Sequence, residues 1–407
     1  AKHLAQGEGL RFNLGHRAPV EGYSNFLWVL GCALVERLGL EVTLWSRLSS
    51  AMAGAALLFA VVSSTRRALG LSRIGLCATG LFLASLPPFA MWTTSGLETM
   101  ATALTLFMAW ERLLADPQRP RGASCGILLL LAALLRADGA VFALFLLAGA
   151  TLVWAVSERP RPLGRALSRA TAILVLGVGA HVAWRLGYYG DWLPNTARVK
   201  AGFSLLRIER GWRYVASFVL SVPALALLLL CSLRRLPAQL AHVWIPALTI
   251  TLASAAYAVW VGGDFMPFGR FLFPTIPFLA LCFALPFSPH LVRSGPRSLR
   301  AWLLGLGAPL LSVLACFDIL PFTSALLERF HFRLDRAWSS EVERWKDMGI
   351  NEDRWVLLGR ALAGHTKLGE SMILGGIGAI SYLTELTIYD TYGLVTPEVV
   401  ARGKIRA

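Results

Sequence analysis

Apolar residues form long runs along most of the chain, and short polar segments separate these runs. A helix needs about 20 mostly apolar residues to cross a lipid bilayer. Runs close to this length cover residues 46–64, 74–91, 98–114, 138–156, 170–186, 214–232, 244–261, 270–288 and 300–320, and a shorter run covers 122–137. The pattern predicts an α-helical polytopic membrane protein.

The composition supports this prediction and narrows the choice of partners. Of the 407 residues, 56% are hydrophobic and 15% are charged, whereas a soluble domain has roughly 25% charged residues. The net charge of +15 is compatible with nucleic-acid binding, but the basic residues lie between the apolar runs, where signals of membrane topology are found. We therefore expect membrane lipids and no nucleic acid among the partners. The six cysteines show no C-x-x-C spacing, and we expect no metal site and no cofactor.

Arginine-rich segments follow every second apolar run, and this alternation predicts the orientation of the spans. Cytoplasmic segments are enriched in Lys and Arg. The rule places these segments outside the inner (cytoplasmic) membrane: 1–45, 92–98, 136–139, 186–213, 261–270 and the chain after about 320. The scheme requires that 122–137 crosses the membrane and that 24–40, an amphipathic segment, lies on the outer surface. The alternative is that 24–40 is an ordinary span, which gives the spans a different parity.

The chain changes character after residue 320. A polar segment of helical period, SSEVERWKDMGINEDRWVLLGRALAGH, is followed by a pattern typical of strand, helix, strand and turn. We predict a transmembrane domain over 1–320 and a small α/β extracytoplasmic domain over 321–407. The chain opens on AKHLAQGEGL, which reads as the end of a helix stopped by glycines. We expect it to continue at both ends, with one more span upstream of Ala1.

One acid and one base stand out in the stretch VWVGGDFMPFGRFLFP. Asp264 and Arg270 lie six positions apart between two apolar runs. A charge at that depth usually has a partner and faces the interior of the helix bundle. Either the two form an ion pair that fixes the turn, or Arg270 binds a phosphate while Asp264 orients it or a sugar hydroxyl. Arg136 and Asp138 in LLRADG pose the same choice, and there the structural interpretation is favoured.

The outer segment 186–213 is basic, against the sidedness rule, and an anionic ligand is the simplest explanation. Arg198 and Lys200 lie beside PNT, within PNTARVK, and are candidate phosphate ligands, although anionic lipid headgroups would also attract them. Trp192 belongs either to an interfacial aromatic belt or to a sugar-stacking surface. Asn195 lies next to these residues and is a further candidate.

The segment GEGLRFNLGHRAPVEGYSNFLW is rich in polar groups and is predicted to face the same side. It contributes the candidate substrate-binding residues His16, Arg17, Glu21 and Tyr23. Glu98 in TSGLETM is another candidate, unless it simply caps the helix that follows it.

These segments together resemble a known family. GEGLRFN with PVEGYSNFLW, TTSGLETM, LLRADG, GDWLPNTARVKAG, VGGDFMPFGRFLFP and YDTYGLVTPE are similar, in this order, to motifs of bacterial GT-C type integral membrane glycosyltransferases, and in particular to the mycobacterial terminal β-1,2-arabinofuranosyltransferase group. The resemblance covers nearly the whole chain. It implies an inverting transferase that moves a sugar, such as arabinofuranose, from a polyprenyl-phosphate donor to a glycan, lipid or protein acceptor in the cell envelope.

The resemblance also implies roles for individual residues. The acidic motif of the family ends the first span, and no residue of this sequence matches it, so we expect the catalytic base upstream of Ala1, with Glu21 or Asp264 as fallback. Arg270, Lys200 and Arg198 would bind the donor phosphate and stabilise the charge that grows on it.

Two functions of other classes remain open. A transporter or lipid-linked sugar flippase also has many spans and intramembrane charges, but such proteins often contain internal repeats and helices broken at mid-membrane. We find no convincing repeat in the sequence. A signalling or assembly scaffold with an outer domain leaves the basic outer segment unexplained.

Overall fold

The computed structural model describes residues 1–14, 18–116, 118–200, 204–224, 238–289, 297–331 and 338–401. The chain folds into two compact units that are each built from separate parts of the sequence. The larger, helical unit contains residues 46–178 and 204–342, and the smaller unit contains 1–45, 179–203 and 343–407.

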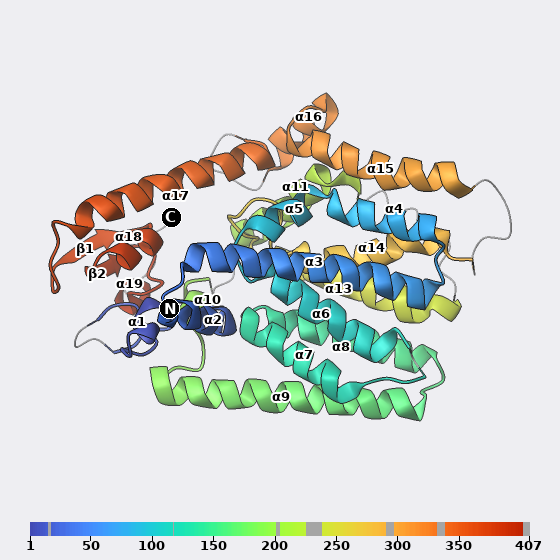
Figure 1. Cartoon of the computed structure of the whole chain (residues 1–407), viewed down its shortest axis with the longest axis horizontal. Helices are drawn as coiled ribbons and strands as arrows, with labels where there is room; N and C mark the ends of the chain where they lie inside the picture. The colour runs from blue at the N-terminus through green and yellow to red at the C-terminus, as the bar shows by residue number, and fades with distance from the viewer. Residues whose placement is uncertain are drawn as a thin grey trace. The chain divides into compact units, whose positions relative to one another are not determined.

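The helical unit consists of apolar helices joined by short turns. Its helices are α3 (Val42–Leu69), α4 (Arg73–Ala84), α5 (Pro87–Thr94), α6 (Thr99–Leu114), α7 (Gly122–Leu135), α8 (Gly139–Val156), the first part of α9 (Arg161–Tyr189), α11 (Leu205–Ser221), α13 (Ala241–Val261), α14 (Ile276–Ala284), α15 (Arg297–Cys316) and α16 (Pro321–Phe330). Helices that follow one another in the sequence pack side by side, as α6 and α7 do (Figure 1). Helices far apart in the sequence do so as well: α8 packs on α13, and α4 packs on α15. Large side chains such as Trp110, Phe107 and Phe278 are fully buried between them.

Several of these helices are long and apolar enough to cross a membrane. Within the described residues, α3, α8, α9 and the segment Ala238–Val261 meet this requirement by length and composition. A fifth candidate is the pair α4 and α5, which is bent by 64°. The helix α7 and the apolar parts of 273–284 and 307–316 are shorter. The coarse prediction of a helical protein with several membrane-length apolar helices is therefore confirmed.

Within the described residues, the predicted spans 74–91 and 270–288 are not continuous helices. The run 74–91 is divided between α4 and α5, and the run 270–288 is divided into η2 (Phe273–Thr275), α14 and η3 (Leu285–Phe287). Prolines occupy the first or second position of several of these pieces, including Pro87 in α5 and Pro277 in α14. A proline restricts the residue before it and lacks the N–H that a continuing helix needs. The sequence correctly predicted that these runs are apolar and helical, but the prediction that each forms one continuous helix was wrong.

The turns of the helical unit gather at its two ends. At one end Ser288 Oγ donates to Leu69 O at 2.9 Å, and Trp110 Nε1 donates to His242 O at 3.0 Å. At the other end Trp92 Nε1 donates to Phe268 O at 3.1 Å. These contacts join the turn after α3 to the turn after η3, and the end of α5 to the turn at 262–271. The side of a membrane to which each end belongs stays a prediction.

The smaller unit carries the only β-sheet of the described residues. It contains α1 (Lys2–Ala5), α2 (Phe26–Arg37), the end of α9, α10 (Asn195–Lys200), most of α17 (Glu341–Ala363), β1 (Ser371–Leu374), α18 (Ile377–Leu383), β2 (Thr387–Asp390) and α19 (Pro397–Ala401). The two strands are parallel, with Ser371 opposite Thr387 and Leu374 opposite Asp390. The order strand, helix, strand matches the sequence prediction, as does a helix within 24–40.

The limits of this unit differ from the domain limits drawn from the sequence. The strands share their unit with 1–45 and 179–203, whereas 321–342 groups with the helices. Asn13 explains part of the grouping, since its side chain donates to Ile388 O at 3.0 Å and accepts from Ile388 N at 2.9 Å. The N-terminal segment is thus hydrogen-bonded to the main chain of β2. No local sequence pattern predicts such a long-range contact.

Candidate functional site

The turn between α13 and η2 holds the Asp264–Arg270 pair in an unusual backbone conformation. Gly263 and Gly269 have φ of +71° and +62°, and Phe268 has φ of +56°, a value rare for a residue with a side chain. A Cβ atom on Gly269 would lie 2.1 Å from the Phe218 ring. Glycine is required here both for its backbone conformation and for the close approach of α11.

Asp264 and Arg270 form an ion pair inside this turn. Arg270 Nε donates to Asp264 Oδ2 at 2.6 Å, and the other oxygen, Oδ1, accepts from Phe265 N at 2.9 Å. The side chain of Asp264 is 2% exposed and that of Arg270 is 16% exposed. The pair therefore fixes the turn, as the structural interpretation predicted. The two terminal nitrogens of Arg270 make no hydrogen bond within the described residues, so its capacity to bind an anion is not used up.

A second buried pair lies near the first. Arg136 donates through Nε to Asp138 Oδ1 at 2.7 Å and through Nη2 to Oδ2 at 2.6 Å. Both side chains are at most 8% exposed. Arg136 Nη1 is buried and has no hydrogen-bond partner in the described part of the chain. Glu98 and Asp264 both attract the Arg136 charge, so the two pairs belong to one electrostatic cluster.

Phe271 lies within reach of both guanidinium groups. Its ring centroid is 5.8 Å from Arg136 Cζ and 5.9 Å from Arg270 Cζ, distances at which a cation is attracted to an aromatic ring. The buried Tyr214 hydroxyl accepts a hydrogen bond from Phe271 N at 3.2 Å. We call Glu98, Arg136, Asp138, Asp264 and Arg270 the buried charge cluster.

Glu98 belongs to this cluster and does not cap α6 with its side chain. Its carboxylate makes no capping hydrogen bond, whereas its main-chain oxygen accepts from Thr102. The residue is 5% exposed. The capping alternative therefore does not describe this carboxylate, which is held in the interior of the helical unit among other charges.

The smaller unit gathers a separate group of predicted site residues around Glu21. Arg185 donates to both carboxylate oxygens of Glu21, through Nε at 2.6 Å and through Nη2 at 3.2 Å. Arg185 also contacts His181 Nε2 at 3.1 Å and donates to Trp192 O at 3.2 Å. Burial raises the pKa of Glu21, and the Arg185 guanidinium offsets this only in part. Sequence reasoning missed Arg185, although a cation at the end of an apolar run and just before GYYGDW was a usable signal.

A cavity of about 490 Å³ opens beside this pair. Its polar lining comes from Glu21, Tyr189, Asp191, Asn195 and Arg198. Arg198 donates to Asp191 Oδ1 at 2.6 Å, and this hydrogen bond lowers the pKa of Asp191. A donor phosphate bound at Arg198, as the sequence predicted, would therefore have to compete with the Asp191 carboxylate that already holds this side chain.

The other predicted residues of this group have different surroundings. The Asn195 amide donates to Gly393 O at 2.5 Å and to Leu394 O at 2.8 Å, so it ties α10 to the turn after β2 and is not free for a substrate. The Tyr23 hydroxyl hydrogen-bonds the Tyr189 hydroxyl at 2.9 Å. The residue Trp192 is 58% exposed, which suits either a membrane interface or a sugar-stacking surface.

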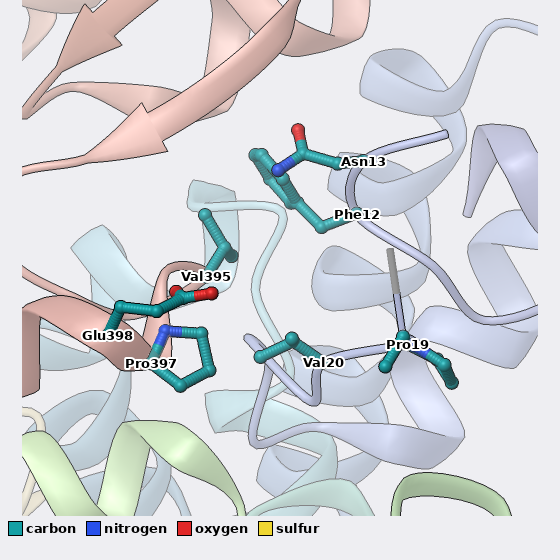
Figure 2. Close-up of a pocket in the computed structure, with 8 residues that line it drawn as sticks. Phe12, Asn13, Pro19, Val20, Val395, Pro397 and Glu398 are labelled. Carbon is teal, nitrogen blue, oxygen red and sulfur yellow. The ribbon is translucent and has the colours of Figure 1, made fainter. Parts of the chain in front are cut away.

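A second cavity of about 410 Å³ adjoins the first along residues 18–20. Figure 2 shows that its walls come from both ends of the chain, with Phe12, Pro19 and Val20 facing Pro397 and Glu398. Its walls are mainly apolar apart from Asn13 and the Glu398 carboxylate.

Three of the predicted site residues cannot be placed. His16 and Arg17 lie outside the described residues, and the side chain of Lys200 is not described. The remaining candidates fall into the buried charge cluster and the Glu21 group, which belong to different units. Within the described residues, no group of three or more His, Cys, Asp or Glu side chains could hold a metal ion.

Comparison with known families gives one match. Residues 345–406 match a family described as "Domain of unknown function (DUF8728)". This range covers most of α17 and the β1–α18–β2–α19 segment. No curated protein and no solved structure matches the chain.

Proposed function

We propose that the protein is an integral membrane glycosyltransferase of the GT-C type. In this proposal it transfers a sugar, with inversion, from a polyprenyl-phosphate donor to an acceptor hydroxyl of the cell envelope, outside the cytoplasmic membrane. Three observations support it: the apolar helices of membrane length, the ordered motifs that resemble this class, and the buried charge cluster at one end of the helical unit.

The buried charge cluster is the observation that carries the proposal. Its two guanidinium groups approach the same aromatic ring, and each keeps at least one terminal nitrogen without a hydrogen bond in the described residues. Arg is suited to phosphate because its donors form a rigid fork. Buried carboxylates hold the guanidiniums in place, so the site is organised before a ligand arrives.

The proposed sugar transfer depends on cations that stabilise the departing phosphate, and the leaving group needs no general acid. The acceptor oxygen forms a bond to the anomeric carbon while the bond from that carbon to the phosphate oxygen breaks, and the electron pair leaves with the lipid phosphate. Arg270 and Arg136 would stabilise the charge that develops on this leaving group. Asp264 acts as a positioning residue, since its two oxygens hold Arg270 Nε and Phe265 N.

A carboxylate must also take the proton from the acceptor hydroxyl. General-base assistance of this kind contributes roughly 100- to 10,000-fold to a rate. The engagement of Asp264 with Arg270 makes it a poor choice for this task. The raised pKa of Glu21 suits a base better, but its bidentate contact with Arg185 would have to open first. We therefore assign the base to neither residue.

A lipid-linked sugar flippase is the second candidate, and one observation favours it. The broken segments α4–α5 and 273–287 are of the kind found in transporters. In both cases proline accounts for the break, and the buried charge cluster lies at an end of the helical unit.

A donor-consumption assay separates the two functions. The protein in membrane vesicles is supplied with a radiolabelled polyprenyl-phosphate sugar and an envelope extract as acceptor. Transfer yields labelled polymer together with free polyprenyl phosphate, and Arg270→Ala should strongly reduce the release of both. Movement of intact labelled lipid across the vesicle membrane without cleavage would overturn the transferase and favour the flippase.

A further inference from the structure

A groove lined by arginine residues lies between α8 and α9 in the helical unit. Its volume is about 1250 Å³. Thr151 and Trp154 of α8 form one wall, and α9 from Arg161 to Val175 forms the other. Neither the proposed transfer reaction nor the buried charge cluster uses these residues.

Arginine side chains on α9 give the groove its charge. Arg161, Arg165 and Arg169 follow one another at intervals of four residues, so they share one face of the helix about 6 Å apart. All three are exposed, and none forms an ion pair within the described residues. Arg159 adds a fourth charge, and no acidic residue is among the described residues that line the groove. Like charges at this spacing repel each other, and a bound anion would relieve that repulsion.

The rest of the groove suits a hydrocarbon chain. Leu167 lies between Arg165 and Arg169, and Ala172 and Val175 continue the groove along α9 beyond the arginines. The Trp154 ring lies 5.8 Å from Arg159 Cζ, and its buried Nε1 has no hydrogen-bond partner in the described part of the chain. A buried indole N–H without an acceptor is unusual in proteins, because leaving it unpaired costs free energy.

We propose that this groove binds an anionic phospholipid of the surrounding bilayer. The phosphodiester headgroup lies among Arg161, Arg165 and Arg169, and the acyl chains follow the apolar wall toward Val175. Both flanking helices are of membrane-spanning length, and basic pockets between such helices are suited to anionic lipid headgroups. The inference rests on membrane insertion of α8 and α9 and is independent of the proposed transferase activity.

Lipid binding to the delipidated protein in a neutral detergent tests the proposal. Native mass spectrometry would compare dioleoylphosphatidylglycerol with dioleoylphosphatidylcholine at equal concentration, and we expect preferential binding of the former. Neutralising the face with R161Q/R165Q/R169Q should weaken phosphatidylglycerol binding about 100-fold, at roughly a factor of five for each guanidinium. The variant R161K/R165K/R169K keeps the charge and should retain most of the binding.

A matched control distinguishes lipid binding in this groove from a general effect of the protein's net charge. R66Q/R73Q/R119Q removes three exposed arginines from other basic segments and should leave phosphatidylglycerol binding unchanged. Equal losses in the two triple variants would overturn the proposal. Displacement of the lipid by glycerol 1-phosphate at the same concentration would also overturn it, because the site would then recognise a soluble anion. Circular dichroism melting confirms that each variant is folded, and the sugar-transfer assay on the same samples reports the transferase separately.

Discussion

Arg185 holds the carboxylate of Glu21 with two hydrogen bonds, of 2.6 and 3.2 Å, although 164 residues separate them in the sequence. The contact joins the N-terminal segment to the last turns of α9. Both side chains are largely buried, at 4% and 13% exposure. A buried pair of this kind contributes little net free energy while it is intact, but it is costly to break, because the partner left behind is an uncompensated charge.

The first prediction follows from this asymmetry. Glu21→Ala and Arg185→Ala should each lower the free energy of unfolding by roughly 3 kcal/mol, and the double variant should lose clearly less than the sum of the two. Thermal unfolding in detergent, followed by circular dichroism, measures the losses. The exposed pair Asp191–Arg198 is the matched control in the same unit, and Arg198→Ala should change little. Additive losses for Glu21 and Arg185 would contradict a direct coupling.

The second prediction concerns the shape of the turn that carries Arg270. Gly269→Ala places a Cβ atom 2.1 Å from the Phe218 ring at a φ of +62°, so we expect misfolding or a loss of more than about 2 kcal/mol in stability. Gly307→Ala in α15 is the control, since nothing lies within 4 Å of its added Cβ and alanine favours a helix by up to about 1 kcal/mol. Yields and melting temperatures of the two purified variants should therefore move in opposite directions.

The fold was largely predictable from the sequence wherever a local pattern determines it. Apolar runs of helical length located most helices, and the strand–helix–strand order of 371–390 was visible in the alternation of residue types. The breaks at Pro87 and within 273–287 were signalled by prolines, but the apolar composition of those runs outweighed that signal. The unit limits could not be predicted, because the Asn13–Ile388 contact joins segments 375 residues apart.

The candidate site was predictable only in part, and for a similar reason. The Asp264–Arg270 pair is local, so spacing alone indicated it, and the structure contains it. Arg185 was missed because its partner Glu21 is remote, and Asn195 was assigned to a substrate because its contact with the turn at 393–394 is also long-range. Residue type indicates that a polar group needs a partner, whereas the tertiary fold determines which partner it finds.

The third prediction tests the role of Arg270 in the proposed reaction. Arg270→Ala should lower sugar transfer by about 100- to 1000-fold while the protein remains folded, the loss typical of removing one donor that stabilises developing charge. Arg270→Lys should lose most of the activity, because an ammonium cannot both hold Asp264 and offer two further donors. The initial rate of polyprenyl-phosphate release measures the effect. Recovery of activity in Asp264→Ala/Arg270→Ala would show that the pair serves structure alone.

The last prediction tests the orientation on which the proposed function depends. The exposed residues Leu205 and Phe265 belong to segments that the arginine pattern places outside the membrane, and Pro162 belongs to a basic segment placed inside. In a variant without its native cysteines, L205C and F265C should therefore react in intact cells with a thiol reagent that cannot cross the membrane. P162C should react only after the cells are permeabilised, which also proves that its thiol is accessible. Labelling of P162C in intact cells at the rate of the other two would reverse the topology and would place the buried charge cluster on the side away from an extracytoplasmic acceptor.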